Sequence, residues 1–131
     1  MNLKLYFITL PIYIALDLLW VGLIANNFYK SQIGNLMADK PNWAAIIIFY
    51  LIFTAGLVFF VINPAILKNS QSYAFLVGAL FGLMTYGTYD LINLALIKNW
   101  PLPATLIDLA WGIAVCSIVS GLSFLASSKL L

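Results

Sequence analysis

Four apolar runs, each long enough to cross a membrane as a helix, constrain this chain more than any other feature. They cover about residues 5–25, 43–67, 73–97 and 104–126. A helix rises about 1.5 Å per residue, so about 20 apolar residues span the roughly 30 Å hydrocarbon core of a bilayer. The runs meet that length, and the sequence therefore predicts four transmembrane helices.

The composition argues against a soluble alternative. Hydrophobic residues make up 64% of the 131 residues and charged residues only 8%, whereas soluble domains carry about 25% charged residues. A soluble helical bundle also needs polar stripes with a period of about 3.6 residues, and none is continuous here. We therefore predict an all-α, polytopic membrane protein, a four-transmembrane-helix bundle that forms a single transmembrane domain over residues 1–131.

The first connection, residues 26–42, is the only long one. Its apolar side chains share one face of a helix, and they are Tyr29, Ile33, Leu36 and Met37. This spacing predicts a short amphipathic segment that lies in the membrane interface.

The membrane orientation is left open by the charges. Four spans place both termini on the same side of the membrane, and lysines near span ends normally decide which side is cytoplasmic. The six lysines divide evenly, with Lys4, Lys68 and Lys129 on one side and Lys30, Lys40 and Lys98 on the other. We expect a multi-pass protein of the cell inner (plasma) membrane, and a net charge of +2 on isolated lysines gives no basic patch for nucleic acid.

Three of the four acidic residues lie inside the apolar runs, namely Asp17, Asp90 and Asp108. The chain has no histidine, arginine or glutamate, and its lysines fall at or beyond the ends of the runs. An ionised Asp at the centre of a membrane helix costs roughly 2.5–3.5 kcal/mol, and such residues usually face a bundle interior and mark a functional path. We expect the three carboxyls to meet in one enclosed chamber and to hold at least one proton near neutral pH.

Helix faces and depth support this clustering. Asp17 and Trp20 share one face of the first helix, and Asp108 and Trp111 share one face of the fourth. Counted from the span ends, all these residues lie in the half of the bilayer next to the first and third connections. The predicted site for a ligand or proton contains Asp17, Trp20, Tyr50, Tyr86, Tyr89, Asp90, Asn93, Asp108 and Trp111.

Glycines in the third and fourth helices indicate close helix packing. Gly78 and Gly82 form a G-x-x-x-G pattern that continues into Tyr86, Asp90 and Asn93 on one stripe. Small residues at this spacing let another backbone approach closely. The predicted packing positions are Gly78, Gly82, Gly87 and Gly112.

Three motifs in order make the sequence resemble a known family. They are D-L-L-W from Asp17, Y-G-T-Y-D-L-I-N from Tyr86 and D-L-A-W-G from Asp108. The chain resembles, over essentially its whole length, an uncharacterised bacterial membrane-protein family, domain-of-unknown-function family 2177. The resemblance implies a small, mostly helical inner-membrane protein but no activity. Its marked positions match Asp17, Trp20, Tyr86, Gly87, Thr88, Tyr89, Asp90, Asn93, Trp100, Pro101, Asp108, Trp111 and Gly112.

The first functional hypothesis is binding or proton-coupled transport of a small hydrophobic or cationic molecule. Carboxyls supply counter-charge and exchangeable protons, and aromatic faces supply cation–π contacts. Membrane lipids are expected partners. A homodimer is expected if the protein transports its ligand, because four helices enclose little pore.

Two alternatives stay open. An acid/base pair such as Asp17 and Asp90 could move protons on a lipid or isoprenoid double bond, with Trp20 or Trp111 stabilising a cation. The chain could instead be a non-catalytic scaffold or partner subunit, in which Asp and Asn hydrogen bonds join helices. Because the sequence shows no nucleophile–base pair, phosphate loop or metal-ligand cluster, it assigns no catalytic residue, cofactor or metal and favours a non-enzymatic role.

Overall fold

The computed structural model describes residues 2–130, and within them it contains helices and connections but no strand. In chain order the elements are α1 (Leu3–Leu19), the π-helix η1 (Trp20–Ile24), α2 (Asn26–Ile33), the 3₁₀-helix η2 (Gly34–Leu36), α3 (Trp43–Leu57), the π-helix η3 (Val58–Ile62), α4 (Asn63–Leu67), α5 (Gln71–Leu96) and α6 (Leu102–Leu130). The predicted all-α architecture is confirmed.

Consecutive elements combine into four helices that are long and apolar enough to cross a membrane, at Leu3–Ile24, Trp43–Leu67, Gln71–Leu96 and Leu102–Leu130. The second span has the predicted bounds, whereas the fourth continues past the predicted end at residue 126. There the hydroxyls of Ser127 and Ser128 donate to the carbonyls of Phe124 and Leu125 at 2.7 Å each. These polar side chains are therefore satisfied within the helix and do not end it.

The helix starts are set by side-chain caps. The Asn2 side chain accepts from the Lys4 amide, the Asn42 side chain from the Ala45 amide, and Ser70 Oγ from the Tyr73 amide. Such caps satisfy backbone N–H groups that the first helical turn leaves without partners. Asn or Ser immediately before the first helical residue thus sets where three of the four spans begin.

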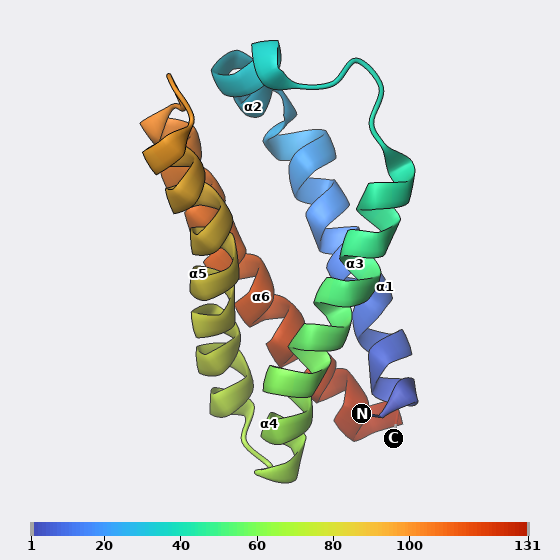
Figure 1. The fold of residues 1–131 in the computed structure, drawn as a ribbon. Coiled ribbons are helices and arrows are strands. Elements are labelled where there is room, and N and C mark those ends of the chain that lie inside the picture. The colour runs from blue at the N-terminus through green and yellow to red at the C-terminus, as the bar shows by residue number, and fades with distance from the viewer. Residues whose placement is uncertain (1, 131) are drawn as a thin grey trace.

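The spans converge at one end of the molecule and diverge at the other (Figure 1). The start of α1 and the end of α6 lie at the converging end, together with α4. At the opposite end α2 and the connection to α3 extend over the top of the bundle, and α3 stands apart from α5. The helical segment predicted in the first connection is present as α2 and η2.

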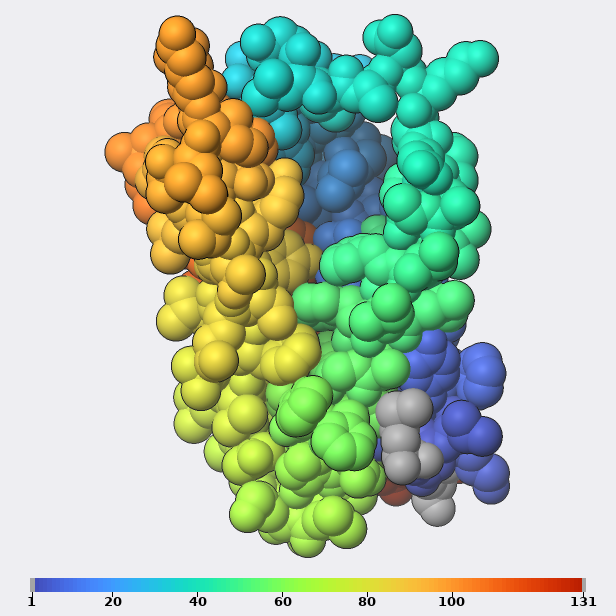
Figure 2. Space-filling model, viewed as in Figure 1, coloured from blue at the N-terminus to red at the C-terminus, as the bar shows by residue number. Residues whose placement is uncertain are grey.

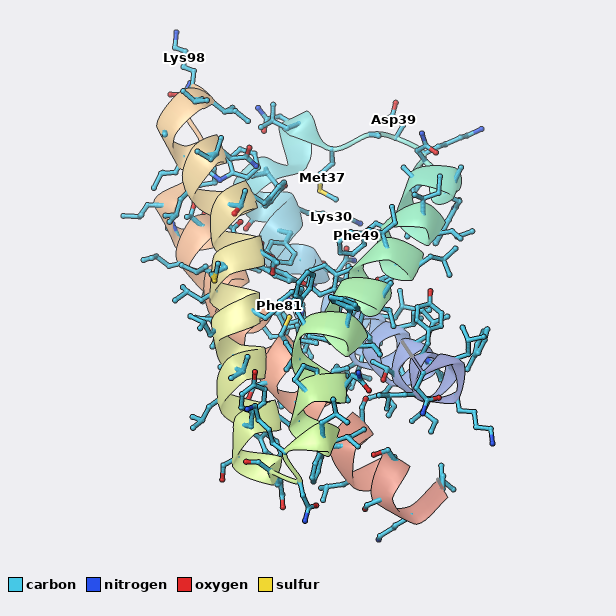
Figure 3. All side chains as sticks on the ribbon, turned by 60° about the horizontal axis from the view of Figure 1, so that its bottom comes forward. Lys30, Met37, Asp39, Phe49, Phe81 and Lys98 are labelled. Atoms are coloured by element: carbon cyan, nitrogen blue, oxygen red, sulfur yellow. The ribbon has the colours of Figure 1, made fainter. Side chains whose placement is uncertain are left out.

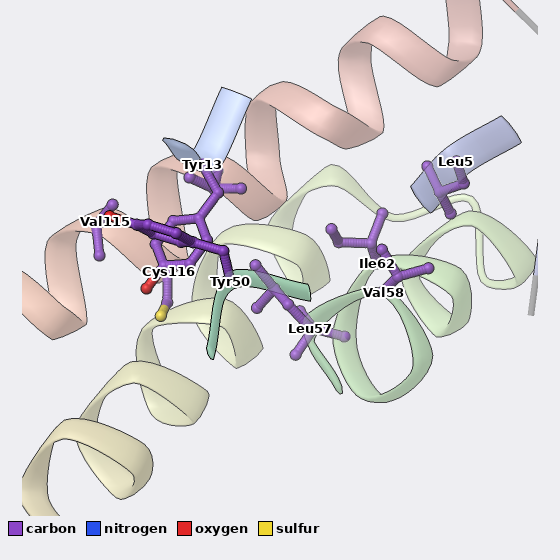
Figure 4. Packing of buried hydrophobic residues seen from close by; sticks show 10 residues of the cluster. Leu5, Tyr13, Tyr50, Leu57, Val58, Ile62, Val115 and Cys116 are labelled. Atoms are coloured by element: carbon purple, nitrogen blue, oxygen red, sulfur yellow. The ribbon is translucent and has the colours of Figure 1, made fainter. Parts of the chain in front are cut away.

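The hydrophobic core occupies the converging part of the bundle. Leu57, Val58 and Ile62 from the second span pack with Leu5 and Val115, and all five side chains are fully buried (Figure 4). The segment η3 contacts both α5 and α6, so it closes the bundle at this level. The apolar core thus fills the converging half of the bundle, and the polar residues of the other half surround a cavity.

Small residues allow α5 and α6 to run in contact along their length. A Cβ atom added at Gly78 would lie 2.7 Å from the carbonyl oxygen of Cys116, and one added at Gly82 would collide with the carbonyl of Gly112. Gly112 in turn lies directly against the ring of Tyr86. Gly87 is different, because an added Cβ would stay 3.6 Å from Leu109 in ordinary contact.

Two π-helical segments interrupt the α-helices, η1 in the first span and η3 in the second. Pro64 follows η3 immediately inside α4, and a proline ring crowds the carbonyl four residues before it. The wider turn of η3 relieves that crowding. The segment η1 brings Trp20 and Val21 into the site described next, and π-turns are frequent at functional sites.

Candidate functional site

The diverging half of the bundle encloses a cavity of about 390 Å³, here called the acidic pocket. All four spans contribute to its walls. Figure 2 shows the hollow between α3 and α5, with α1 at its back. The lining residues are Asp17, Trp20, Val21, Phe49, Phe53, Thr85, Tyr86, Tyr89, Asp108 and Trp111.

Asp17 receives two side-chain hydrogen bonds in the acidic pocket, whereas Asp108 receives one. The Asp17 side chain is 9% exposed. The Tyr50 hydroxyl of α3 donates to Asp17 Oδ2 at 2.6 Å, and the Trp111 indole N–H of α6 donates to Oδ1 at 3.0 Å. Asp17 therefore joins three spans through neutral donors. These donors stabilise a carboxylate without cancelling its charge.

Trp20 and Trp111 stack face to face in the pocket wall. Their ring centroids are 4.6 Å apart and their planes differ by 7°. Trp20 is three residues beyond Asp17, so both lie on the same side of the first span, and Trp111 is three residues beyond Asp108 in α6. The repeated spacing of an acid and a tryptophan thus places two indole rings between two carboxyls.

Asp108 is joined to the loop helix α2 through Tyr29. The Tyr29 hydroxyl donates to Asp108 Oδ1 at 2.9 Å and accepts from the Trp20 indole N–H at 3.1 Å. Burial raises the pKa of the Tyr29 phenol above its ordinary value. Tyr29 therefore stays protonated near neutral pH and serves as a donor to the carboxyl.

Asp90 lines a second cavity of about 210 Å³, here called the loop pocket. Asp90 is 1% exposed, and its Oδ2 atom has no hydrogen-bond partner among residues 2–130. The lining residues are Tyr29, Ile33, Met37, Tyr89, Asp90, Trp100, Ala104 and Asp108. Asp108 and Tyr89 belong to both pockets.

The expectation of one chamber holding all three carboxyls is therefore wrong. Asp17 and Asp108 line the acidic pocket, whereas Asp90 and Asp108 line the loop pocket. The bonded pair of Trp20 and Tyr29 lies at the boundary, since Trp20 lines one pocket and Tyr29 the other. This division was not predictable from spacing along the chain, because it depends on where α2 packs against the bundle.

The other predicted site residues take different positions. Tyr86 lines the acidic pocket, and its hydroxyl hydrogen-bonds that of Tyr13 at 2.8 Å. Tyr50 lines neither pocket but holds Asp17. Tyr89 is 54% exposed at the edge of both pockets. Asn93 is half-buried and lines neither pocket.

Sequence reasoning missed several members of the site. Tyr29 had been assigned only to the interfacial face of the first connection, yet it reaches a carboxyl. Phe49 and Phe53 form the α3 wall of the acidic pocket, and in an apolar run they resemble any lipid-facing residue. Their proximity in sequence to Tyr50 and Thr54 gave no signal, because adjacent residues on a helix point in different directions.

The geometry of the two pockets bears on metal binding and on the acid/base pair considered above. Within residues 2–130, no group of three potential ligands among His, Cys, Asp and Glu could hold a metal ion. The acid/base pair considered for a lipid-modifying enzyme, Asp17 and Asp90, is divided between two pockets. What the acidic pocket offers is negative counter-charge beside aromatic and apolar walls.

The fold and the site define a class: a small multi-pass membrane protein with four apolar helices around an intramembrane acidic pocket. Within that class, residues 2–125 match the model of the family described as "Predicted membrane protein (DUF2177)", and the chain belongs to that family. The resemblance carried by the three motifs is thereby confirmed. No curated protein and no solved structure matches the chain.

Proposed function

We propose that the acidic pocket binds a small hydrophobic or cationic molecule inside the membrane and couples its movement to protonation of a carboxyl. The observation that carries the proposal is the environment of Asp17, a buried carboxyl that receives hydrogen bonds from Tyr50 and Trp111 in the wall of a cavity of about 390 Å³. That volume falls in the range of roughly 300–1,000 Å³ typical of small-molecule sites.

The charge balance favours a cation over a neutral or anionic ligand. The chain has no arginine or histidine, and its six lysines lie at span ends or in connections. No basic residue is therefore placed within the spans at the level of Asp17. A ligand cation or a proton supplies the positive charge that an ionised carboxyl in a membrane needs, and the indole and phenol rings add cation–π attraction.

Binding and protonation are expected to compete. A proton on Asp17 removes the counter-charge, so acidification should weaken binding of a cation. The titratable groups that face Asp17 come from every packed span, and they are Tyr13, Tyr50, Tyr86, Asp108 and Cys116. Of these only Asp108 is a second acid, which places two carboxyls in reach of one ligand.

The test is binding of a lipophilic cation, phenyltrimethylammonium, to the protein in nanodiscs by equilibrium dialysis. Asp17→Asn keeps the shape and an acceptor but removes the charge, and it should weaken binding about tenfold or more, equivalent to about 1.4 kcal/mol. Asp39→Asn is the matched control, because Asp39 lies in the connection before α3, outside the spans (Figure 3).

The two outcomes separate binding from scaffolding. If Asp17→Asn loses binding but keeps its thermal transition, the proposal stands, and uptake of the cation into liposomes against a proton gradient then tests transport. If Asp17→Asn lowers the thermal transition while binding equals that of Asp39→Asn, the pocket only joins helices and the proposal fails.

A further inference from the structure

The acidic pocket opens sideways between α3 and α5. Its floor is Phe53, whose ring contacts Phe81 and Tyr86 of α5 at centroid distances of 5.4 and 6.0 Å. Toward the converging end η3 packs against α5, but beyond Phe53 the helices α3 and α5 separate (Figures 1 and 2). Phe49 and Phe81 extend from the two helices into the space between them (Figure 3).

The opening lies at the depth of lipid chains. Phe49, 43% exposed on the α3 rim, is six residues beyond Trp43 at the start of the span, which corresponds to about 9 Å along a helix. Tyr89 on the α5 rim is seven residues before the end at Leu96, or about 10 Å. One leaflet contributes roughly 15 Å of hydrocarbon, so both rims of the opening lie at the level of the acyl chains.

The loop helix α2 covers the end of the pocket that lies beside the first connection (Figure 1). The helix α2 and the connection that follows it extend over the diverging end (Figure 1), and Tyr29 of α2 is bonded to both Trp20 and Asp108. Hydrogen bonds through Tyr29 therefore connect this end of the pocket to the loop helix. Beyond Phe53, no hydrogen bond among residues 2–130 connects α3 to α5 across the lateral opening.

The walls of the pocket differ in chemistry from its back to its opening. Asp17, Asp108 and the stacked indoles occupy the part formed by α1, η1 and α6, whereas Phe49 and Phe53 form the α3 side of the opening. A cationic head suits the carboxyls and a hydrocarbon chain suits the phenylalanines. A molecule with both parts can place its head inside while its chain remains among the lipids.

We infer that the ligand is a single-chain amphiphile with a protonated amine head, which enters sideways between α3 and α5 from the leaflet next to the first connection. This inference rests on the proposed binding function of the acidic pocket. It adds the ligand class, the route and the leaflet. A compact cation that reaches the site from water would satisfy the proposed function but not this inference.

Tryptophan fluorescence tests the route. In the double variant Trp43→Phe, Trp100→Phe, the remaining indoles are Trp20 and Trp111, which both line the pocket. In vesicles of phosphatidylcholine with brominated acyl chains, we expect loss of this fluorescence, because bromine quenches on contact and the pocket admits chains. Aqueous iodide should quench less. Stronger quenching by iodide than by brominated chains overturns the lateral route.

Competition tests the ligand class. Dodecylammonium added to the brominated vesicles should restore fluorescence saturably by displacing chains, whereas dodecyl sulfate at the same mole fraction should not. Asp17→Asn in the same background should weaken the dodecylammonium effect about tenfold or more, and Asp39→Asn should not change it. Equal restoration by both detergents overturns the cationic class.

The remaining outcomes separate the inference from the proposed function. Binding of phenyltrimethylammonium without quenching by brominated chains leaves the proposed function standing and overturns this inference. If the indoles are protected from bromine at high protein density but are quenched after dilution to one chain per vesicle, a second copy of the chain covers the opening. That result also overturns the inference. Quenching without competition by any cation overturns both.

Discussion

At the scale of single residues, the Asp17 carboxyl is placed between two neutral donors. Hydrogen bonds to charged groups contribute about 1.5–3 kcal/mol in soluble proteins, while bonds between membrane helices average about 0.6 kcal/mol. The short bond from Tyr50, 2.6 Å, connects α3 to α1 in the half of the bundle where the spans diverge. We expect this bond to contribute more than an average interhelical bond.

Tyr50→Phe is accordingly expected to lower the free energy of unfolding by about 1–2 kcal/mol, measured by dodecyl sulfate titration in mixed micelles. In an Asp17→Asn background the same substitution should cost less, because the acceptor is then uncharged. Tyr6→Phe is the matched control, since the Tyr6 hydroxyl donates at 2.9 Å to a neutral acceptor, the Leu51 carbonyl. Equal costs for all three would show that the charge on Asp17 contributes nothing.

At the scale of elements, α5 and α6 form the most closely packed helix pair of the described residues. Gly78, Gly82 and Gly112 bring the two backbones together, so Asp90 and Asp108 are held at fixed positions on one helix pair. The first span and α3 complete the acidic pocket from the other side. The pocket therefore depends on how closely α5 and α6 approach.

Substitution at the α5–α6 contact tests this dependence. Gly82→Ala places a methyl group against the Gly112 carbonyl, and we expect a loss of about 1–3 kcal/mol in unfolding free energy because the helices must separate. Gly87→Ala meets Leu109 only at 3.6 Å, and alanine favours a helix over glycine by up to about 1 kcal/mol. That variant should be as stable as the parent or more so. A similar loss at both positions would contradict the packing described.

At the scale of the whole molecule, the polar groups are asymmetrically distributed. The converging end holds the apolar core, and a cavity of about 370 Å³ at that end is lined only by uncharged residues. Both carboxyl-lined pockets lie in the diverging half, beside the first connection and the α5–α6 connection. The two ends of the bundle therefore differ in polarity, and four spans place them on opposite sides of the membrane.

Sidedness can be measured with a membrane-impermeant maleimide in a Cys116→Ala background, which removes the single native thiol. Cysteines at Asn2 and Ser128 should react from one side of sealed vesicles, and cysteines at Asp39 and Lys98 from the other. Figure 3 shows Lys98 directed away from the bundle at the diverging end. Reaction of positions 2 and 128 from opposite sides would rule out four spans.

The predictable part of the site was the part that follows from periodicity within one helix. Asp17 with Trp20, and Asp108 with Trp111, share faces because of their spacing alone, and both pairs line the acidic pocket. The partners across helices were not predictable in this way. Tyr29, Phe49 and Phe53 depend on the rotation of α2 and α3 about their axes, which no spacing within those helices specifies.

The sequence by itself determined the number of spans, the helical fold and the half of the membrane that holds the carboxyls, because bilayer thickness and the cost of buried charge act on each segment separately. Only the tertiary structure decided that three carboxyls occupy two pockets and that one pocket opens between α3 and α5. Those features arise from helix tilt, from the π-turns of η1 and η3, and from the docking of Tyr29 on Asp108. All three depend on contacts between segments far apart in the chain.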